Sequence, residues 1–299
     1  MRLALAWRET LLPAPSEREV AGGLLFMKPC ISQATTMPCS FADDVAHYAD
    51  AGCDAIEVWL TKLENHLEKN SASDTCKLLE ERGMTLAAAA YQGGLLLSQG
   101  EQRKAHYEHF RKRLDLCQQF GIKTLLVVAD FVDKVVDADL SRAVVSLTQA
   151  AQWAAGYGVT LALEFRGKNT FCASLDTGLA LVQACGEPNV GVNLDVFHYY
   201  IGPSKFEDFA SLTLDRLAHV QIADVSSVAR ELATDADRVL PGDGDFQLAP
   251  ILDVLRRLGY QGWVSLELMN PVLWRANPKQ VAEIAFTSLR RILGLAHHG

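Results

Sequence analysis

The chain has 299 residues, of which 49% are hydrophobic and 21% are charged, and its mean hydropathy is +0.07. A chain this long and this apolar buries a sizeable core, which excludes intrinsic disorder and leaves one or two domains. Lys and Arg number 28 against 36 Asp and Glu, so the formal net charge is −8. Binding that is driven by counterion release requires a basic surface, so no nucleic-acid partner is expected.

The seven cysteines are scattered along the chain, and no two of them form a C-x-x-C pair. Secreted disulfide frameworks and zinc ribbons have closer and more regular spacing. We therefore expect reduced, core-packed thiols and a cytoplasmic location. No run approaches the roughly 18 apolar residues of a membrane span, so no membrane partner is expected.

Residues 1–26 differ from the rest of the chain. Their short apolar start is interrupted by charged residues and by Pro13 and Pro15, unlike the apolar region of a signal peptide. Met27 is followed by KPCISQ and resembles a second start of the chain. We predict that residues 1–26 are an N-terminal extension outside the fold and that residues 27–299 form one domain.

From Lys28 onward, short apolar runs typical of strands alternate with long amphipathic stretches typical of helices. The apolar runs cover residues 28–33, 55–60, 85–90, 124–130, 160–165, 190–197, 217–224 and 262–268. Clear helical periods cover residues 41–52, 108–121 and 248–260. Glycines that stand between a helical stretch and the next strand fit the left-handed cap of an αβ connection. These glycines are Gly52, Gly83, Gly121, Gly158 and Gly259.

Eight such units without a Pro- or Ser-rich linker predict an α/β fold, a single (β/α)8 TIM barrel. An open doubly wound sheet is the alternative. It is disfavoured because no G-x-G-x-x-G motif follows the first strand.

Active sites of such barrels lie at the C-terminal ends of the strands, and polar residues gather at four successive strand ends. Glu164 ends the fifth strand, Asp195 ends the sixth, and Glu267 lies at the end of the eighth. The seventh strand carries His219 and Gln221, which share one side because side chains alternate along a strand. A lone carboxylate in a strand usually pairs with an arginine, but four neighbouring strand ends are harder to explain in that way.

Carboxylates that converge at one place repel each other, and a divalent cation offsets that repulsion directly. We expect a metal site with Glu164, Asp195, Gln221 and Glu267 as ligands, and His219 is the alternative third ligand. With Gln221 all ligand atoms are oxygen. Hard oxygen ligands favour Mn²⁺ or Mg²⁺ over Zn²⁺ or Co²⁺.

These residues resemble those of the xylose-isomerase-like TIM barrels, a superfamily of sugar isomerases and epimerases with relatives that dehydrate or hydrolyse. The resemblance extends from about Lys28 to the end of the chain and is carried by L-x-L-E-F, L-D-V-F-H, H-V-Q-I-A-D, R-V-L-P-G-D-G and V-S-L-E-L-M-N-P. The R-V-x-P-G-D-G segment and the tail from Trp274 to Pro278 are most similar to inosose isomerases. At position 221 those enzymes usually have histidine, and the glutamine resembles hydroxypyruvate isomerases and some 3-dehydroshikimate dehydratases.

The resemblance implies a divalent-metal-dependent isomerase or epimerase of a small polyhydroxy ketone, either a sugar or an inosose. A proton would move next to the carbonyl through a metal-stabilised enediolate. The resemblance implies metal binding by Glu164, Asp195, Gln221 and Glu267, acid–base catalysis by Glu164 and Glu267, and substrate contacts by His198 and Arg238. A homodimer or homotetramer is the expected assembly.

Each further candidate also has a plainer structural interpretation. His198 fits a loop histidine bonded to backbone, and Arg238 fits a surface arginine. Glu57 and Trp59 suit a pocket wall or barrel packing equally. The apolar residues Leu95 to Leu97, within loop 91–103, fit a lid or a subunit contact, and residues 230–237 are expected to form a mobile loop that carries Arg238 inward.

Three rival functions remain. A 3-dehydroshikimate-type dehydratase would use the same metal site but expel a hydroxyl group, and Gln221 favours it. An apurinic endonuclease shares the fold but needs more histidines at the strand ends and a surface that attracts DNA. A barrel that has lost catalysis and serves in binding would be expected to lack some of the candidate ligands.

Overall fold

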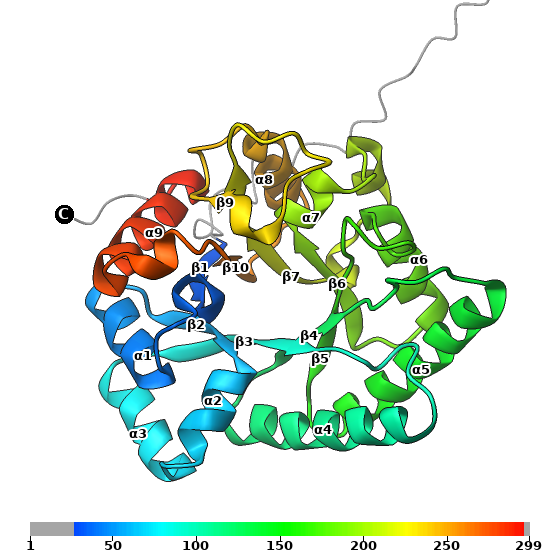
Figure 1. Ribbon diagram of the computed structural model, residues 1–299, viewed down its shortest axis with the longest axis horizontal. Helices are drawn as coiled ribbons and strands as arrows, with labels where there is room; N and C mark the ends of the chain where they lie inside the picture. Colours follow the sequence, from blue (N-terminus) through cyan, green and yellow to red (C-terminus); the bar gives the residue numbers. More distant parts are fainter. Residues whose placement is uncertain (1–26, 296–299) are drawn as a thin grey trace, which may run out of the picture.

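The computed structural model describes residues 27–295, and eight parallel strands close into a barrel ringed by helices (Figure 1). Around the barrel the order is β1, β10, β7, β6, β5, β4, β3, β2, and β2 pairs with β1 to close it. The barrel strands are β1 (Lys28–Ser32), β2 (Ala55–Trp59), β3 (Thr85–Gln92), β4 (Thr124–Val128), β5 (Thr160–Glu164), β6 (Val190–Asp195), β7 (Leu217–Ile222) and β10 (Trp263–Leu266). The predicted TIM barrel is confirmed.

The helices lie on the outer side of the strands. They are α1 (Phe41–Asp50), α2 (Leu60–Leu67), α3 (Ala72–Glu81), α4 (Gly100–Gln119), α5 (Asp137–Ala155), α6 (Leu175–Cys185), α7 (Val196–Ile201), α8 (Leu248–Arg257) and α9 (Pro278–Leu293). The last helix packs against β1 and α1, so the two ends of the described chain meet (Figure 1). Helix α4 begins at Gly100, before the helical period at 108–121 that the sequence shows. The sequence does not reveal the first turns of this helix, because they are polar and have no clear apolar period.

The glycines predicted to cap helices adopt the left-handed conformation. Gly52, Gly83, Gly121, Gly158 and Gly259 have φ between 63° and 79°. A residue with a Cβ is strained in this region. These glycines therefore set where each helix stops and the chain turns into the next strand.

Along each strand, successive side chains face the surrounding helices and the interior of the barrel in turn. The main apolar core lies between the strands and the helices, and it includes Leu95 and Leu96, which are fully buried. Core packing therefore accounts for these two leucines, in place of a lid or a subunit contact. A separate small cluster of Ala88, Ala90, Leu126 and Ala162 lies apart from this core. Three of its four members are alanines, whose side chains take up little space.

A short antiparallel hairpin follows β7 and positions Arg238. It consists of β8 (Asp224–Val225) and β9 (Arg238–Val239), in which Val225 pairs with Arg238. The buried Asp224 carboxylate accepts hydrogen bonds from the backbone N–H groups of Gly242 and Phe246, at 3.0 and 2.9 Å. A Cβ on Gly244 would lie 2.3 Å from Asp224 Oδ1, so only glycine fits there. The Pro-Gly-Asp-Gly turn thus anchors the hairpin.

The predicted extension, residues 1–26, lies outside the described residues, so its role stays a prediction. Within residues 27–295, none of the helices has both the length and the apolar character needed to cross a membrane.

Candidate active site at the barrel mouth

A cavity of about 160 Å³ opens at the C-terminal ends of the strands. Five of the predicted site residues line it: Glu164, His198, Gln221, Arg238 and Glu267. Trp59, Leu126 and Val128 supply apolar wall. The sixth predicted site residue, Asp195, is fully buried beside them and is hydrogen-bonded to Arg238. Residues that are up to 103 positions apart, from Glu164 to Glu267, thus meet at one place.

Glu164, Asp195 and His198 form a tight group of potential metal ligands. Each offers one ligand atom, and these atoms all lie within 4.8 Å of one another. His198 Nε2 lies 3.3 Å from Glu164 Oε1 and 3.7 Å from Asp195 Oδ2. Oxygen and nitrogen atoms this close to each other surround a space of the size that a cation fills.

Asp195 places His198 in this group. Its carboxylate accepts a hydrogen bond from the backbone N–H of Phe197 at 2.9 Å and thereby caps α7. His198 follows within the first turn of that helix, and its side chain is 4% exposed. Neither ring nitrogen of His198 makes a hydrogen bond of good geometry. A buried ring nitrogen that lacks a hydrogen bond is costly, so these two nitrogens suit contact with a further bound group.

Arg238 is a fully buried counter-ion to three carboxylates. Its Nη2 donates to Asp195 Oδ2 at 2.7 Å and to Asp235 Oδ1 at 2.8 Å, and its Nη1 lies 3.2 Å from Glu267 Oε2. The guanidinium also lies over the Phe197 ring, 4.1 Å from its centroid. Burial lowers the pKa of Arg238, but Asp195, Glu267 and Asp235 more than offset this and raise it above the usual value. Arg238 therefore stays charged.

Arg238 only partly compensates Glu267. Burial raises the pKa of Glu267 well above its usual value, Arg238 opposes that shift, and the carboxylates of Glu57, Asp195 and Glu164 add to it. At this site the four carboxylates of Glu164, Asp195, Asp235 and Glu267 face the two guanidinium groups of Arg166 and Arg238. Together with His198, whose ring nitrogens make no hydrogen bond, this fits a bound divalent cation held mainly by oxygen ligands.

The two candidates on β7 have different surroundings. Gln221 lines the cavity, whereas His219 is one inward-facing position deeper, with its Nε2 2.8 Å from Glu57 Oε2. Glu57 Oε1 also accepts a hydrogen bond from Gln221 Nε2 at 2.9 Å. Trp59 lines the cavity, while Glu57 lies below it as a fully buried hydrogen-bond acceptor. This geometry favours Gln221 over His219 as the residue that reaches a metal.

Two charged residues at the cavity were not singled out from the sequence. Arg166 lines it, with Nη1 4.0 Å from Glu164 Oε1 and Nη2 3.4 Å from Asp235 Oδ2. Burial raises the pKa of Asp235, but Arg238, His198 and Arg166 more than offset this and lower it. Arg166 comes two residues after Glu164 in the sequence, so its place next to a predicted site residue could have indicated that it lies at the site. Asp235 carries no such signal, because only the folding of its loop brings it to the cavity.

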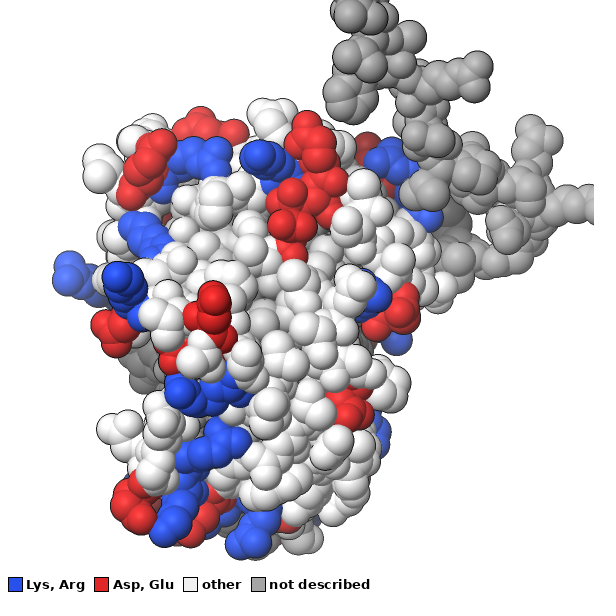
Figure 2. Space-filling view, turned by 90° about the vertical axis from the view of Figure 1, so that its right-hand side faces the viewer, with Lys and Arg blue, Asp and Glu red and all other residues white. Residues whose placement is uncertain are grey.

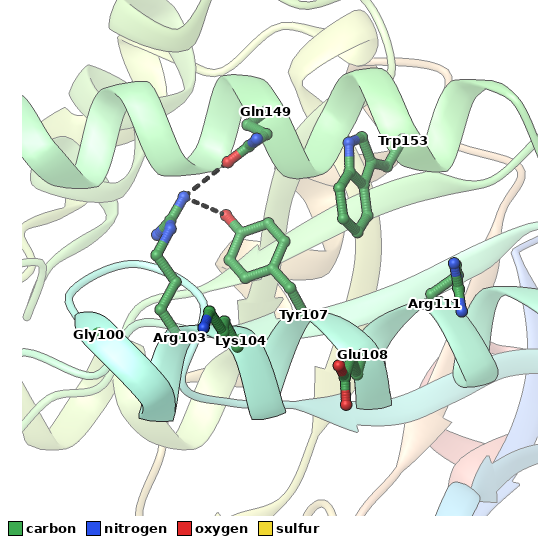
Figure 3. A pocket seen from close by; sticks show the side chains of 8 residues that line it. All are labelled: Gly100, Arg103, Lys104, Tyr107, Glu108, Arg111, Gln149 and Trp153. Carbon is green, nitrogen blue, oxygen red and sulfur yellow. Dashed lines mark hydrogen bonds between the residues drawn. The ribbon is translucent and has the colours of Figure 1, made fainter.

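A larger hollow of about 370 Å³ lies outside the barrel, between α4 and α5. Figure 3 shows Arg103 there, bonded to Tyr107 and Gln149. Lys104 is paired with Glu101 at 2.8 Å. Because these cations already have protein partners, and because no group of potential metal ligands was found there among residues 27–295, the chemistry belongs to the barrel mouth.

Comparisons with known proteins show which family this barrel resembles in sequence and in fold. The sequence pattern of the family described as xylose isomerase-like TIM barrel matches residues 45–292. The inosose isomerase of Halalkalibacterium halodurans is 26% identical over 272 residues, which is 87% of this chain and 94% of that protein. The 3-dehydroshikimate dehydratase of Pseudomonas aeruginosa is 26% identical, over 89% of this chain and 40% of that protein. The crystal structure of the IOLI protein with a bound zinc atom has a TM-score of 0.85 and 24% identity, covering 91% of this chain and all of that one.

Proposed function

Because the chain belongs to the xylose isomerase-like TIM barrel family, we propose that it is a divalent-metal-dependent isomerase or epimerase of a small polyhydroxy ketone. An inosose or a ketose is the substrate class. The observation that carries this proposal is the convergence of Glu164, Asp195, His198 and Glu267 around one buried cavity. The similarity to inosose isomerases supports it.

We propose Glu164, Asp195, Gln221 and Glu267 as the residues that hold the metal. Oxygen ligands suit Mn²⁺ or Mg²⁺, while the zinc of the similar IOLI structure keeps Zn²⁺ as a second choice. When bound, the ion would supply polarisation of a substrate carbonyl and of the neighbouring hydroxyl group. The cavity, about 160 Å³, is below the roughly 300 Å³ at which drug-sized sites begin, so the substrate is small.

The protein's own groups then move the proton. Glu164 on β5 and Glu267 after β10 stand at strand ends that β7 and β6 separate. One carboxylate takes the proton from the carbon next to the carbonyl, and the other returns a proton to the neighbouring carbon or to the opposite face. His198 donates to a substrate oxygen. The guanidinium of Arg238 contacts both Asp195 and Glu267, and its positive charge offsets the repulsion between their carboxylates.

The second candidate is a dehydratase of the 3-dehydroshikimate type. Gln221 favours it, since a glutamine there resembles some of these enzymes, and the similarity to the Pseudomonas aeruginosa protein adds to this. The first proton abstraction would be the same. The difference is that the acid group would protonate a departing hydroxyl group on the β-carbon, so that water is lost.

A substrate screen separates the two. Purified protein is incubated with Mn²⁺ or Mg²⁺ and with inososes, ketohexoses or 3-dehydroshikimate, and products are resolved by NMR after the metal has been removed. Interconversion of a polyhydroxy ketone without loss of water supports the isomerase. Formation of protocatechuate from 3-dehydroshikimate identifies the dehydratase. No conversion of any compound with Mn²⁺, Mg²⁺, Zn²⁺ or Co²⁺ rejects both.

A further inference from the structure

Glu57 is a fully buried carboxylate with no part in the chemistry described so far. It lies on β2, which β1 and β10 separate from β7 around the barrel (Figure 1). We propose that Glu57 is a positioning residue that fixes the amide of Gln221 with its oxygen available to the metal. This inference rests on the proposed function, because it assigns Gln221 to the metal site.

The Glu57 carboxylate determines which end of the Gln221 amide faces it. A glutamine side chain has a donating end and an accepting end of the same shape, and either can turn toward a neighbour. An ionised carboxylate only accepts, so it selects the Nε2 end of Gln221, which donates to Glu57 Oε1 at 2.9 Å. The oxygen of Gln221 must then lie on the other side of the amide.

The oxygen of Gln221 keeps a free lone pair. Within residues 27–295 it accepts one hydrogen bond, from Asn193 Nδ2 on β6 at 2.5 Å. A carbonyl oxygen has two lone pairs, so one remains for a cation. Because Gln221 also lines the cavity, this oxygen is suited to be a metal ligand there.

His219 holds the second oxygen of Glu57. Its Nε2 lies 2.8 Å from Glu57 Oε2, and both residues are buried. A carboxylate in the interior needs donors on both oxygens to offset the cost of its burial. Glu57 is thus fixed on both sides, and it orients Gln221 as outer-shell carboxylates orient metal ligands elsewhere.

The decisive variant is Glu57→Gln, which keeps the shape but restores the ambiguity. The new side chain can donate as well as accept, so Gln221 can turn its NH₂ group toward the cation. We expect the dissociation constant for Mn²⁺, measured by isothermal titration calorimetry, to rise by about 10- to 100-fold. Glu68→Gln, on the exposed surface after α2, removes the same charge and should leave the affinity unchanged.

A double-mutant cycle separates positioning from charge. In Gln221→His, the imidazole can bind the metal through one nitrogen and donate from the other to residue 57, whether that residue is Glu or Gln. In the Gln221→His background, Glu57→Gln should therefore raise the dissociation constant for Mn²⁺ by less than about threefold. If it costs the same factor in both backgrounds, Glu57 acts through its charge alone and the proposal is wrong.

The outcomes also separate this inference from the proposed function. If the unmodified protein binds neither Mn²⁺ nor another divalent ion, the proposed function fails. If it binds Mn²⁺ and Glu57→Gln binds equally well, only the role of Glu57 fails.

A measurement on the unmodified protein covers the case in which Glu57→Gln does not fold. With ¹⁵N-labelled glutamine, the NH₂ signal that disappears in Gln221→His belongs to Gln221. We expect its protons to be protected from solvent exchange and to persist when diamagnetic Zn²⁺ is added. Fast exchange like that of an exposed amide would overturn the proposal.

Discussion

Arg238 shows how much a single residue can determine at this site. Its guanidinium is buried and lies between Asp195, Asp235 and Glu267, so removing it leaves three carboxylates near one another without their shared cation. Losing one partner of a buried ion pair is far more costly than losing a pair on the surface, because the remaining charge has no water to solvate it.

We expect Arg238→Met to lower the free energy of unfolding by about 3–5 kcal/mol in EDTA. The chelator matters because a bound cation would replace part of the missing charge. Urea denaturation followed by circular dichroism measures the effect. The matched control is Arg256→Met. Arg256 is paired with Asp253 on the exposed surface of α8, so its loss should change stability by less than about 1 kcal/mol. Equal effects would show that the Arg238 pairs contribute no more than surface pairs.

At the scale of elements, Asp44 joins three segments beside the barrel. On α1, its carboxylate accepts hydrogen bonds from Gln33 Nε2 and Thr36 Oγ1, both in the short 3-10 helix Gln33–Thr36, at 2.9 and 2.5 Å. It also binds Lys62 Nζ of α2 at 2.7 Å. Burial raises the pKa of Asp44 to about 6, although Lys62 opposes that shift.

The raised pKa of Asp44 predicts a definite pH dependence of stability. Because the folded pKa exceeds that of an unfolded aspartate, about 3.9, the folded state holds the proton more tightly. This stabilising contribution is fully present below the pKa of the unfolded aspartate, about 3.9. It is lost as the pH rises through the pKa of folded Asp44, about 6. The free energy of unfolding of the wild type minus that of Asp44→Asn should therefore fall between pH 4 and pH 6.5. A difference that is flat or rises would contradict this, and Asp115→Asn on the exposed side of α4 is the control.

The barrel strands could be predicted from local signals in the sequence. The contacts among polar side chains from different strands could not. Apolar runs and the glycines that follow helices locate all eight barrel strands. The strand ends likewise indicate Glu164, Asp195 and Glu267. In contrast, Gln221 and Glu57 are 164 positions apart, and nothing local links them. The β8–β9 hairpin has two residues in each strand, too few to show a period, so the burial of Arg238 was not visible in the sequence.

At the scale of the whole molecule, the distribution of charge matters more than the net value of −8. Figure 2 shows acidic and basic side chains interspersed over the face that it presents. At the barrel mouth, Glu164, Asp195 and Glu267 lie together with Arg238 as the buried cation. Carboxylates that line a concave site with low-dielectric walls draw cations toward it.

Metal binding should therefore stabilise the whole barrel. A ligand that binds only the folded state at 100 times its dissociation constant adds about 2.7 kcal/mol to the free energy of unfolding. We expect the melting temperature to fall in EDTA and to rise when Mn²⁺ is added back in excess. The double variant Glu164→Gln/Asp195→Asn should lose this response, whereas Glu283→Gln, exposed on α9, should keep it. An Mn²⁺ response that survives in the double variant would place the metal elsewhere.

The most direct test of the account is the exchange of a carbon-bound substrate proton with solvent. The protein, loaded with Mn²⁺ or Mg²⁺, is incubated in D₂O with inososes and ketoses, and the signal next to the carbonyl is followed by ¹H NMR after metal removal. We expect deuterium to appear at that carbon, at a rate that falls by about 10²–10⁴-fold in Glu267→Gln, because a positioned acid–base group contributes that much. Absence of deuterium with every compound, or an unchanged rate in Glu267→Gln, would contradict it.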